Sequence, residues 1–324
     1  MKKIIATVGP SLLHTTPLTA IHDDKNIYRI NGAHGTISEI EEYILKIKEQ
    51  INDAKILMDL PGNKVRTANF QYGYIDIENN KEFSLSFNQM NYKSFFKHLK
   101  VGDEVWANDS IFRFTIESIN VEIANITFLS HSTGRLLNNK GMHVRGVHKD
   151  IPFLFEKDIE LIELANKYDL DFIGLSFVRD AKDIQEAKKL IKHSKIISKV
   201  ETLSAVHNLN EILEEVEFIL IDRGDLSTEI GLNKVPMYQK FIIEKALFYN
   251  KKIFLATQFL KSMEHNPVPT IPEVIDMYNS LKMGIYGVQM SEETAVGKYP
   301  KECLEVINGL MQELKEETKK ELIL

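Results

Sequence analysis

The sequence is poor in the features that mark secreted, membrane and nucleic-acid-binding proteins. It has one cysteine, Cys303, so no internal disulfide can form and a reducing compartment is the expected environment. None of its apolar runs approaches the roughly 20 residues that a membrane-spanning helix needs. We therefore expect a cytoplasmic protein with no membrane partner.

Positive charge is not concentrated anywhere along the chain. The formal net charge is −6 and there is no dense basic stripe, which argues against a nucleic-acid partner. No Walker A loop (GxxxxGK) occurs, so any bound nucleotide is held in another way. The 324 residues, 44% hydrophobic and 27% charged, have a globular composition and suit one large domain or two moderate ones.

Short apolar runs alternate with helical patterns over most of the chain. Strands are predicted at Lys3–Gly9, Asn26–Ile30, Lys55–Leu60, Phe172–Phe177, Ile196–Ile197, Phe218–Ile221, Ile253–Thr257 and Gly287–Met290. Helices are predicted at 36–52, 156–167, 181–193, 203–214, 237–250, 272–283 and 301–316, with Thr36 or Ser38 as the first cap. This α/β pattern predicts a (β/α)8 TIM barrel formed by residues 1–67 and 147–324.

Residues 68–146 have a different pattern of apolar and polar residues. Short alternating runs, such as Tyr74–Ile77, Phe83–Phe87, Glu104–Trp106, Phe112–Ile119 and Val121–Leu129, are separated by Asn, Gly and Asp. The segment is therefore expected to form a small all-β domain inserted into the barrel.

Charged residues follow two neighbouring strands of the predicted barrel. Lys199 and Glu201 end one strand, and Asp225 follows the next. Ligands bind at the carboxyl ends of parallel strands, and two carboxylates suit a hard divalent cation such as Mg²⁺. A lysine beside them suits a transferring group on which negative charge develops. The alternative is a solvated ion network without catalytic function.

Several motifs, in order along the chain, resemble those of the pyruvate kinase family. They are KIIATVGPS, YRINGAHG, DLPGNKVRT, NNKGMHVRG, IPFLFEKD, GLSFVRDAKD, KIISKVE, DRGDL, LATQFLKSM and SEETAVGKYP. The resemblance implies a barrel with a small β lid inserted after the third strand. The family's C-terminal domain, with its effector site, is not expected here because the chain stops soon after the last predicted helix.

The resemblance also implies roles for individual residues. Glu201 and Asp225 would bind the divalent metal, Mg²⁺ or Mn²⁺, and Lys199 would bridge the transferring phosphoryl group. Arg29, Arg66 and Lys140 would hold nucleotide phosphates, and Thr257 would lie beside the substrate's methyl end. The backbone N–H groups of Gly224 and Asp225 would hold the substrate carboxylate at a helix start.

The monovalent-cation site of the family is altered in this sequence. Asn31 and Asp59 match two of its residues, but Ala33 and Leu60 replace hydroxyl-bearing residues and Lys64 replaces a glutamate. We predict that K⁺ is not required and that the charge of Lys64 substitutes for it. An ordinary surface lysine is the alternative for Lys64.

The acceptor pocket is more polar than the resemblance predicts. Asp222 stands where the family has alanine, Gln289 stands where it has an apolar residue, and Ser291 completes the expected substrate-binding residues. A buried unpaired carboxylate costs on the order of several kcal/mol. We therefore expect Asp222 to have a partner, which is either a neighbouring cation or a polar group on a substrate other than pyruvate.

The expected activity is phosphoryl transfer between phosphoenolpyruvate, or a related enolphosphate of a 2-oxo acid, and ADP to give ATP. The resemblance favours a role in glycolysis, and phosphorylation of a pathway-specific 2-oxo acid is one alternative. The other is a catalytically silent barrel that binds a phosphorylated metabolite and regulates a partner. A homodimer is the assembly that the resemblance leaves open.

Overall fold

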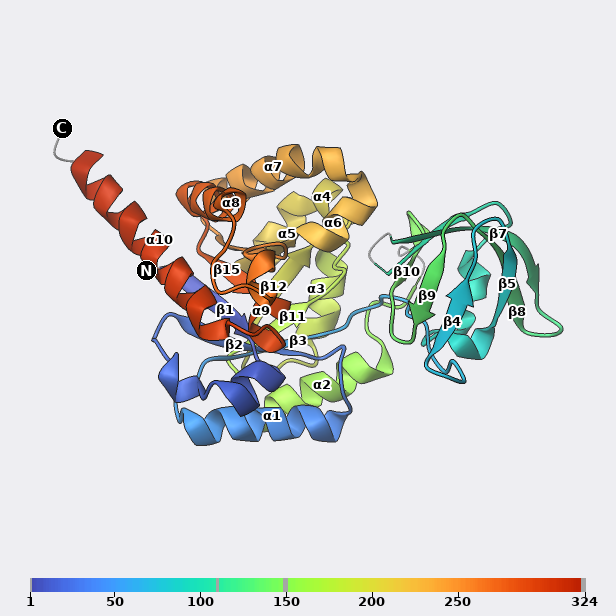
Figure 1. Ribbon diagram of the computed structural model, residues 1–324, viewed down its shortest axis with the longest axis horizontal. Helices are drawn as coiled ribbons and strands as arrows, with labels where there is room; N and C mark the ends of the chain where they lie inside the picture. Colours follow the sequence, from blue (N-terminus) through green and yellow to red (C-terminus); the bar gives the residue numbers. More distant parts are fainter. Residues whose placement is uncertain (1, 109–110, 148–150, 322–324) are drawn as a thin grey trace. The chain divides into compact units, whose positions relative to one another are not determined.

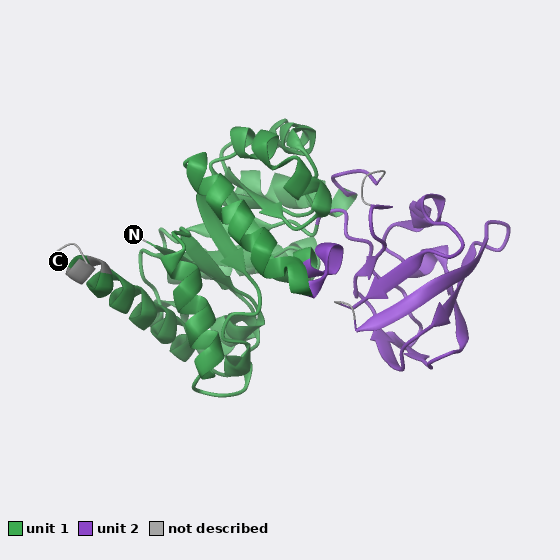
Figure 2. Ribbon diagram, turned by 90° about the horizontal axis from the view of Figure 1, so that it is seen from above, with its two compact units in different colours: residues 1–61, 156–226, 233–324 green, residues 62–155, 227–232 purple. Residues whose placement is uncertain are grey.

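The computed structural model describes residues 2–108, 111–147 and 151–321, and these form two compact units (Figure 2). Unit 1 comprises Met1–Pro61, Glu156–Leu226 and Asn233–Leu324, and unit 2 comprises Gly62–Phe155 and Ser227–Leu232. The domain boundaries at residues 67/68 and 146/147 stay a prediction.

Unit 1 is a closed barrel of parallel strands surrounded by helices (Figure 1). Around the barrel the strands are β1 (Lys3–Thr7), β15 (Gly287–Met290), β14 (Lys252–Ala256), β13 (Phe218–Asp222), β12 (Lys195–Val200), β11 (Phe172–Leu175), β3 (Ile56–Asp59) and β2 (Asn26–Asn31). The first strand pairs with both the second and the last, which closes the sheet. The predicted eight strands and the TIM-barrel class are confirmed.

The main helices outside the barrel agree with the predicted pattern. They are α1 (Ile37–Gln50), α2 (Glu156–Lys167), α3 (Ala181–Lys188), α7 (Val235–Phe248), α8 (Ile271–Lys282) and α10 (Pro300–Glu321). Thr36 caps α1 in a reciprocal capping box with Glu39, so the first of the two proposed caps is the one used.

Local departures from the predicted helices have identifiable reasons. The predicted helix at 203–214 divides at Asn208 into α4 (Leu203–His207) and α5 (Leu209–Glu215). The connection from β1 to β2 contains only two short helical turns, η1 (Ser11–Thr15) and η2 (Leu18–Ala20). Two short helices, α6 (Arg223–Ile230) and α9 (Glu292–Ala295), follow β13 and β15 directly and have no long apolar stripe that periodicity could reveal.

The barrel interior places the charged residues by simple alternation. A buried apolar cluster inside the barrel includes Ile27, Leu57, Ile197 and Leu220. Side chains two positions further along a strand face the same way. Arg29, Asp59, Lys199 and Asp222 each follow one of these core residues by two positions. They therefore form a polar layer directly above the apolar core, at the carboxyl ends of the strands.

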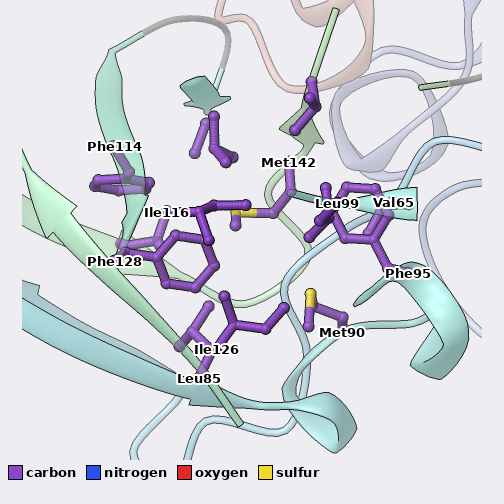
Figure 3. Packing of buried hydrophobic residues seen from close by; sticks show 14 of the residues in the cluster. Val65, Leu85, Met90, Phe95, Leu99, Phe114, Ile116, Ile126, Phe128 and Met142 are labelled. Atoms are coloured by element: carbon purple, nitrogen blue, oxygen red, sulfur yellow. The ribbon is translucent and has the colours of Figure 1, made fainter. Parts of the chain in front are cut away.

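Unit 2 contains the inserted all-β domain. Its strands form a five-stranded sheet, β10 (Met142–His143), β6 (Glu104–Ala107), β7 (Phe112–Asn120), β8 (Asn125–Ser130) and β5 (Glu82–Ser86), and a two-stranded sheet, β4 (Tyr74–Ile77) and β9 (Gly134–Leu137). Figure 3 shows its own core, in which Phe114, Phe128 and Ile116 pack near Met142 and Leu85. The short 3₁₀ helices η3 (Phe87–Gln89) and η4 (Lys93–His98) also belong to this unit. In the sequence, η6 (Leu232–Lys234) spans the boundary between the two units, and η7 (Lys261–Glu264) belongs to unit 1.

Two further features concern the helices and the single cysteine. Among the described residues, no helix combines the length and the apolar character that crossing a bilayer requires. Cys303 lies fully buried in α10, and burial raises the pKa of its thiol to about 12. It is therefore a core residue and not a nucleophile.

Candidate active site

The ammonium group of Lys199 is the centre of the polar layer. Its Nζ lies 3.3 Å from Glu201 Oε2, 3.6 Å from Asp222 Oδ2 and 3.8 Å from Asp59 Oδ2. It also donates a hydrogen bond of 3.0 Å to Ser176 Oγ. Burial alone would lower the pKa of Lys199, but the surrounding carboxylates raise it above its ordinary value, so the group stays charged.

Three carboxylates next to Lys199 could hold a metal ion. Glu201, Asp222 and Asp225 each offer an oxygen atom, and these atoms all lie within 4.8 Å of one another. Glu201 is 0% exposed; its Oε1 accepts a 2.6 Å hydrogen bond from Phe177 N–H, whereas its Oε2 accepts none. Burial, reinforced by Asp225 and Asp222, raises the pKa of Glu201 despite Lys199. A divalent cation bound by these oxygens would remove the cost of that buried charge, so the residues fit Mg²⁺ or Mn²⁺.

Asp222 is held at the first turn of α6. Its Oδ1 accepts hydrogen bonds from Gly224 N–H (3.2 Å), Asp225 N–H (3.4 Å) and Thr257 Oγ1 (3.4 Å). The structure therefore gives Asp222 both a neighbouring cation, Lys199, and the positive end of a helix. The two backbone N–H groups expected to hold a substrate carboxylate already donate to the chain's own carboxylate.

Arg29 and Asp59 form a buried ion pair across β2 and β3. Arg29 Nη2 lies 2.6 Å from Asp59 Oδ2, and Nε donates to the same oxygen at 2.8 Å. Arg29 Nη1 also donates to Thr7 Oγ1 at 2.8 Å. This pairing fixes the guanidinium beside the Lys199 cluster, since Asp59 contacts both cations.

The loop after β14 is strained. The backbone φ angles of Thr257, Gln258 and Leu260 are 68°, 57° and 50°. These values lie in the left-handed region, which residues other than glycine rarely adopt. Arg223 braces this loop, because Nε and Nη2 donate to the Thr257 carbonyl oxygen at 3.1 and 2.6 Å and Nη1 contacts Asp276 Oδ2 at 2.8 Å. Strain of this kind, about 1–3 kcal/mol per residue, collects at functional sites.

A pocket of about 500 Å³ adjoins Arg29 at the ends of β1, β2 and β15. Asn31 and Ser291 also line it, together with Pro10, His14, His34, Tyr43 and Lys46. The side chain of Asn31 is occupied locally, because its Oδ1 accepts a hydrogen bond of 3.1 Å from Ala33 N–H. The volume suits a group such as a nucleoside, and Arg29 is one of the residues that would contact it.

Three basic residues that the sequence analysis assigned to phosphate binding or to the monovalent-cation site, Lys64, Arg66 and Lys140, lie near one backbone bridge within unit 2. Arg66 pairs with Gly141 in an antiparallel bridge. Next to Gly141, the Lys140 carbonyl oxygen accepts a hydrogen bond of 2.8 Å from Thr67 N–H, and Lys140 N–H donates to Thr67 Oγ1 at 2.9 Å. The Lys64 side chain lies against Gly141, because a Cβ atom at position 141 would be 2.4 Å from Lys64 Cε.

Most of the predicted site residues thus lie together in unit 1, whereas Lys64, Arg66 and Lys140 lie in unit 2. The sequence reasoning missed four supporting residues: Thr7, Ser176, Phe177 and Arg223. Phe177, with φ 56°, presents its N–H to Glu201, and Ser176 orients Lys199. All four lie at or just beyond the carboxyl end of a predicted strand, and this position is the sequence feature that could have identified them.

Comparison with known proteins agrees with this geometry. The family model "Pyruvate kinase, barrel domain" matches residues 1–304. The pyruvate kinase of Thermotoga maritima is 34% identical over 96% of this chain and 70% of its own length. Those of Geobacillus stearothermophilus and Dictyostelium discoideum are each 31% identical, over 95% and 96% of this chain and 56% and 66% of their own lengths. The chain thus spans between about half and two thirds of most of these relatives, and it belongs to the pyruvate kinase family.

Proposed function

We propose that this chain is a phosphotransferase that moves a phosphoryl group between the enolphosphate of a 2-oxo acid and ADP. The observation that carries the proposal is the convergence of Lys199 and three carboxylates at the carboxyl ends of the barrel strands. Phosphoryl transfer requires mainly positioning and positive charge around the moving oxygens, and these residues supply both.

The metal ligands of the proposal are Glu201 and Asp225. When bound there, Mg²⁺ or Mn²⁺ would act as a Lewis acid that neutralises negative charge on the oxygen atoms of the substrate. Lys199 would bridge the transferring group, because its raised pKa keeps it an ammonium ion at neutral pH. Arg29 is positioned by Asp59 and Thr7 to bind a nucleotide phosphate, and the adjoining pocket would take the rest of the nucleotide.

The remaining assignments rest on residue types. Arg66 and Lys140 are proposed as further phosphate-binding groups, and Thr257 and Ser291 as substrate-binding groups. K⁺ independence is proposed because Ala33 and Leu60 offer no side-chain oxygen, with the Lys64 ammonium as the substitute charge. A substrate carboxylate at the start of α6 would share the Gly224 and Asp225 N–H groups with Asp222.

The test combines a binding and a turnover measurement. Mn²⁺ binding is followed by electron paramagnetic resonance, and ATP formation from ADP and phosphoenolpyruvate by a coupled assay. Glu201→Gln should weaken Mn²⁺ binding at least tenfold, and Lys199→Met should retain it but lose at least about 10²-fold in rate, as for other removed transition-state charges.

Ser198→Ala is the matched control for both variants. Ser198 lies next to Lys199 on β12, and its buried Oγ has no hydrogen-bond partner, so its removal should leave binding and turnover unchanged. Metal and enolphosphate binding without turnover of any 2-oxo acid by the unmodified chain would instead support the catalytically silent barrel.

A further inference from the structure

We propose that Asp222 and Gln289 select the substrate of this chain: a 2-oxo acid whose third carbon carries a hydrogen-bond donor such as a hydroxyl group. The inference rests on the proposed function, because the proposed function places the reacting acid at this end of the barrel. It comes from two buried polar side chains that flank one small residue on the inner wall.

The first observation is the acceptor character of Asp222. This residue is 7% exposed, and its Oδ1 accepts hydrogen bonds from the N–H groups of Gly224 and Asp225 at the start of α6. Its Oδ2 lies 3.6 Å from Lys199 Nζ. A buried acceptor at this place favours a hydrogen-bond donor on the substrate over an apolar group.

The second observation is the unsatisfied amide of Gln289. This residue is 1% exposed, and its Oε1 has no hydrogen-bond partner. On β15 it lies in register with Ile5 and Ala256, which both belong to the apolar cluster inside the barrel. A buried carbonyl oxygen without a donor costs about 1–3 kcal/mol, which a donor on a ligand would recover.

Asp222 and Gln289 lie on either side of the same small residue. Asp222 is in register with Ala256 on one side, and Gln289 is in register with Ala256 on the other. The side chain between the two acceptors is only a methyl group. A substrate hydroxyl group placed between them could donate to either acceptor, whereas a methyl group would leave the Gln289 carbonyl unsatisfied.

The experiment compares two acids of equal size, 3-hydroxypyruvate and 2-oxobutyrate, which carry a hydroxyl and a methyl group on the third carbon. With Mg²⁺ and ATP in D₂O, one C3–H bond breaks to give the enolate and a C3–D bond forms from solvent. Proton NMR measures the exchange rate, from which the rate without protein is subtracted. We expect the unmodified chain to prefer the hydroxylated acid by about 10²-fold or more.

The variants locate the cause. Gln289→Met, which keeps the side-chain size, and Asp222→Ala should each reduce that preference by about tenfold or more, whereas Ser198→Ala should preserve it. A preference of the unmodified chain for 2-oxobutyrate, or an unchanged ratio in both variants, overturns this inference alone. Loss of Mn²⁺ binding in Asp222→Ala also overturns it, because Asp222 is then a metal ligand. Exchange of neither acid, together with no phosphoryl transfer, overturns the proposed function and the inference with it.

Discussion

Replacement of Lys199 by methionine tests the geometry of the site independently of any substrate. The Lys199 ammonium attracts carboxylate oxygens at 3.3, 3.6 and 3.8 Å. At an effective dielectric constant near 20, each attraction is worth about 4–5 kcal/mol, and the cost of burying the ammonium offsets much of the sum. Loss of one partner from a buried ionic cluster typically costs about 3–5 kcal/mol. The side chain is only 7% exposed, so solvent screens the cluster little.

We therefore expect Lys199→Met to lower the free energy of unfolding of the metal-free protein by about 3–5 kcal/mol. In urea this shifts the transition by about 1 M or more. Mg²⁺ should restore more stability to the variant than to the unmodified chain, because the ammonium no longer competes for the carboxylates. At a hundredfold excess over its Kd, any bound ion contributes about 2.7 kcal/mol.

The chain offers separate signals for its two units. The α-helices, which dominate circular dichroism at 222 nm, lie almost entirely in unit 1, whereas the single tryptophan, Trp106, lies in unit 2. The dichroism transition should shift in Lys199→Met, and it should not shift in Ser198→Ala. Equal stability of Lys199→Met and the unmodified chain, with the same response to Mg²⁺, would refute the reasoning.

Further predictions concern the strained loop, the cysteine and K⁺. Arg223→Gln should destabilise unit 1 by about 2–3 kcal/mol, because the charged hydrogen bonds to the Thr257 carbonyl oxygen are lost. Arg223→Lys cannot donate two hydrogen bonds from one planar group, so it should recover only part of the lost stability. Full stability of Arg223→Gln in a thermal melt would contradict the bracing role. Cys303, with its thiol pKa raised to about 12, should not react with a disulfide reagent at pH 8 until the protein unfolds. Its contribution to stability should be complete below its ordinary pKa and lost as the pH rises towards 12; rapid labelling of the native protein would contradict its burial. The rate of phosphoryl transfer should change less than about twofold when KCl replaces tetramethylammonium chloride, and a many-fold rise would show that Lys64 does not substitute for K⁺.

The sequence alone was sufficient for the barrel, the inserted β domain and the charged strand ends. Apolar periodicity is a local property of the chain, and a strand such as Phe218–Asp222 is specified by its own residues. The same alternation that buries Leu220 places Asp222 on the inner face, so the direction of the site residues was also encoded locally. Helices without an apolar stripe, such as α6, could not be predicted in this way because their sequences show no apolar periodicity.

Only the tertiary structure decided which of these residues share contacts. Asp59 and Asp222 are each more than 20 residues away from Lys199 in the sequence, and the barrel brings an oxygen atom of each within 4 Å of the Lys199 ammonium group. The bracing of Thr257 by Arg223 and the missing partner of Gln289 are likewise long-range results. Hydrogen bonding and desolvation depend on which atoms meet across the barrel, and no local pattern along the chain contains that information.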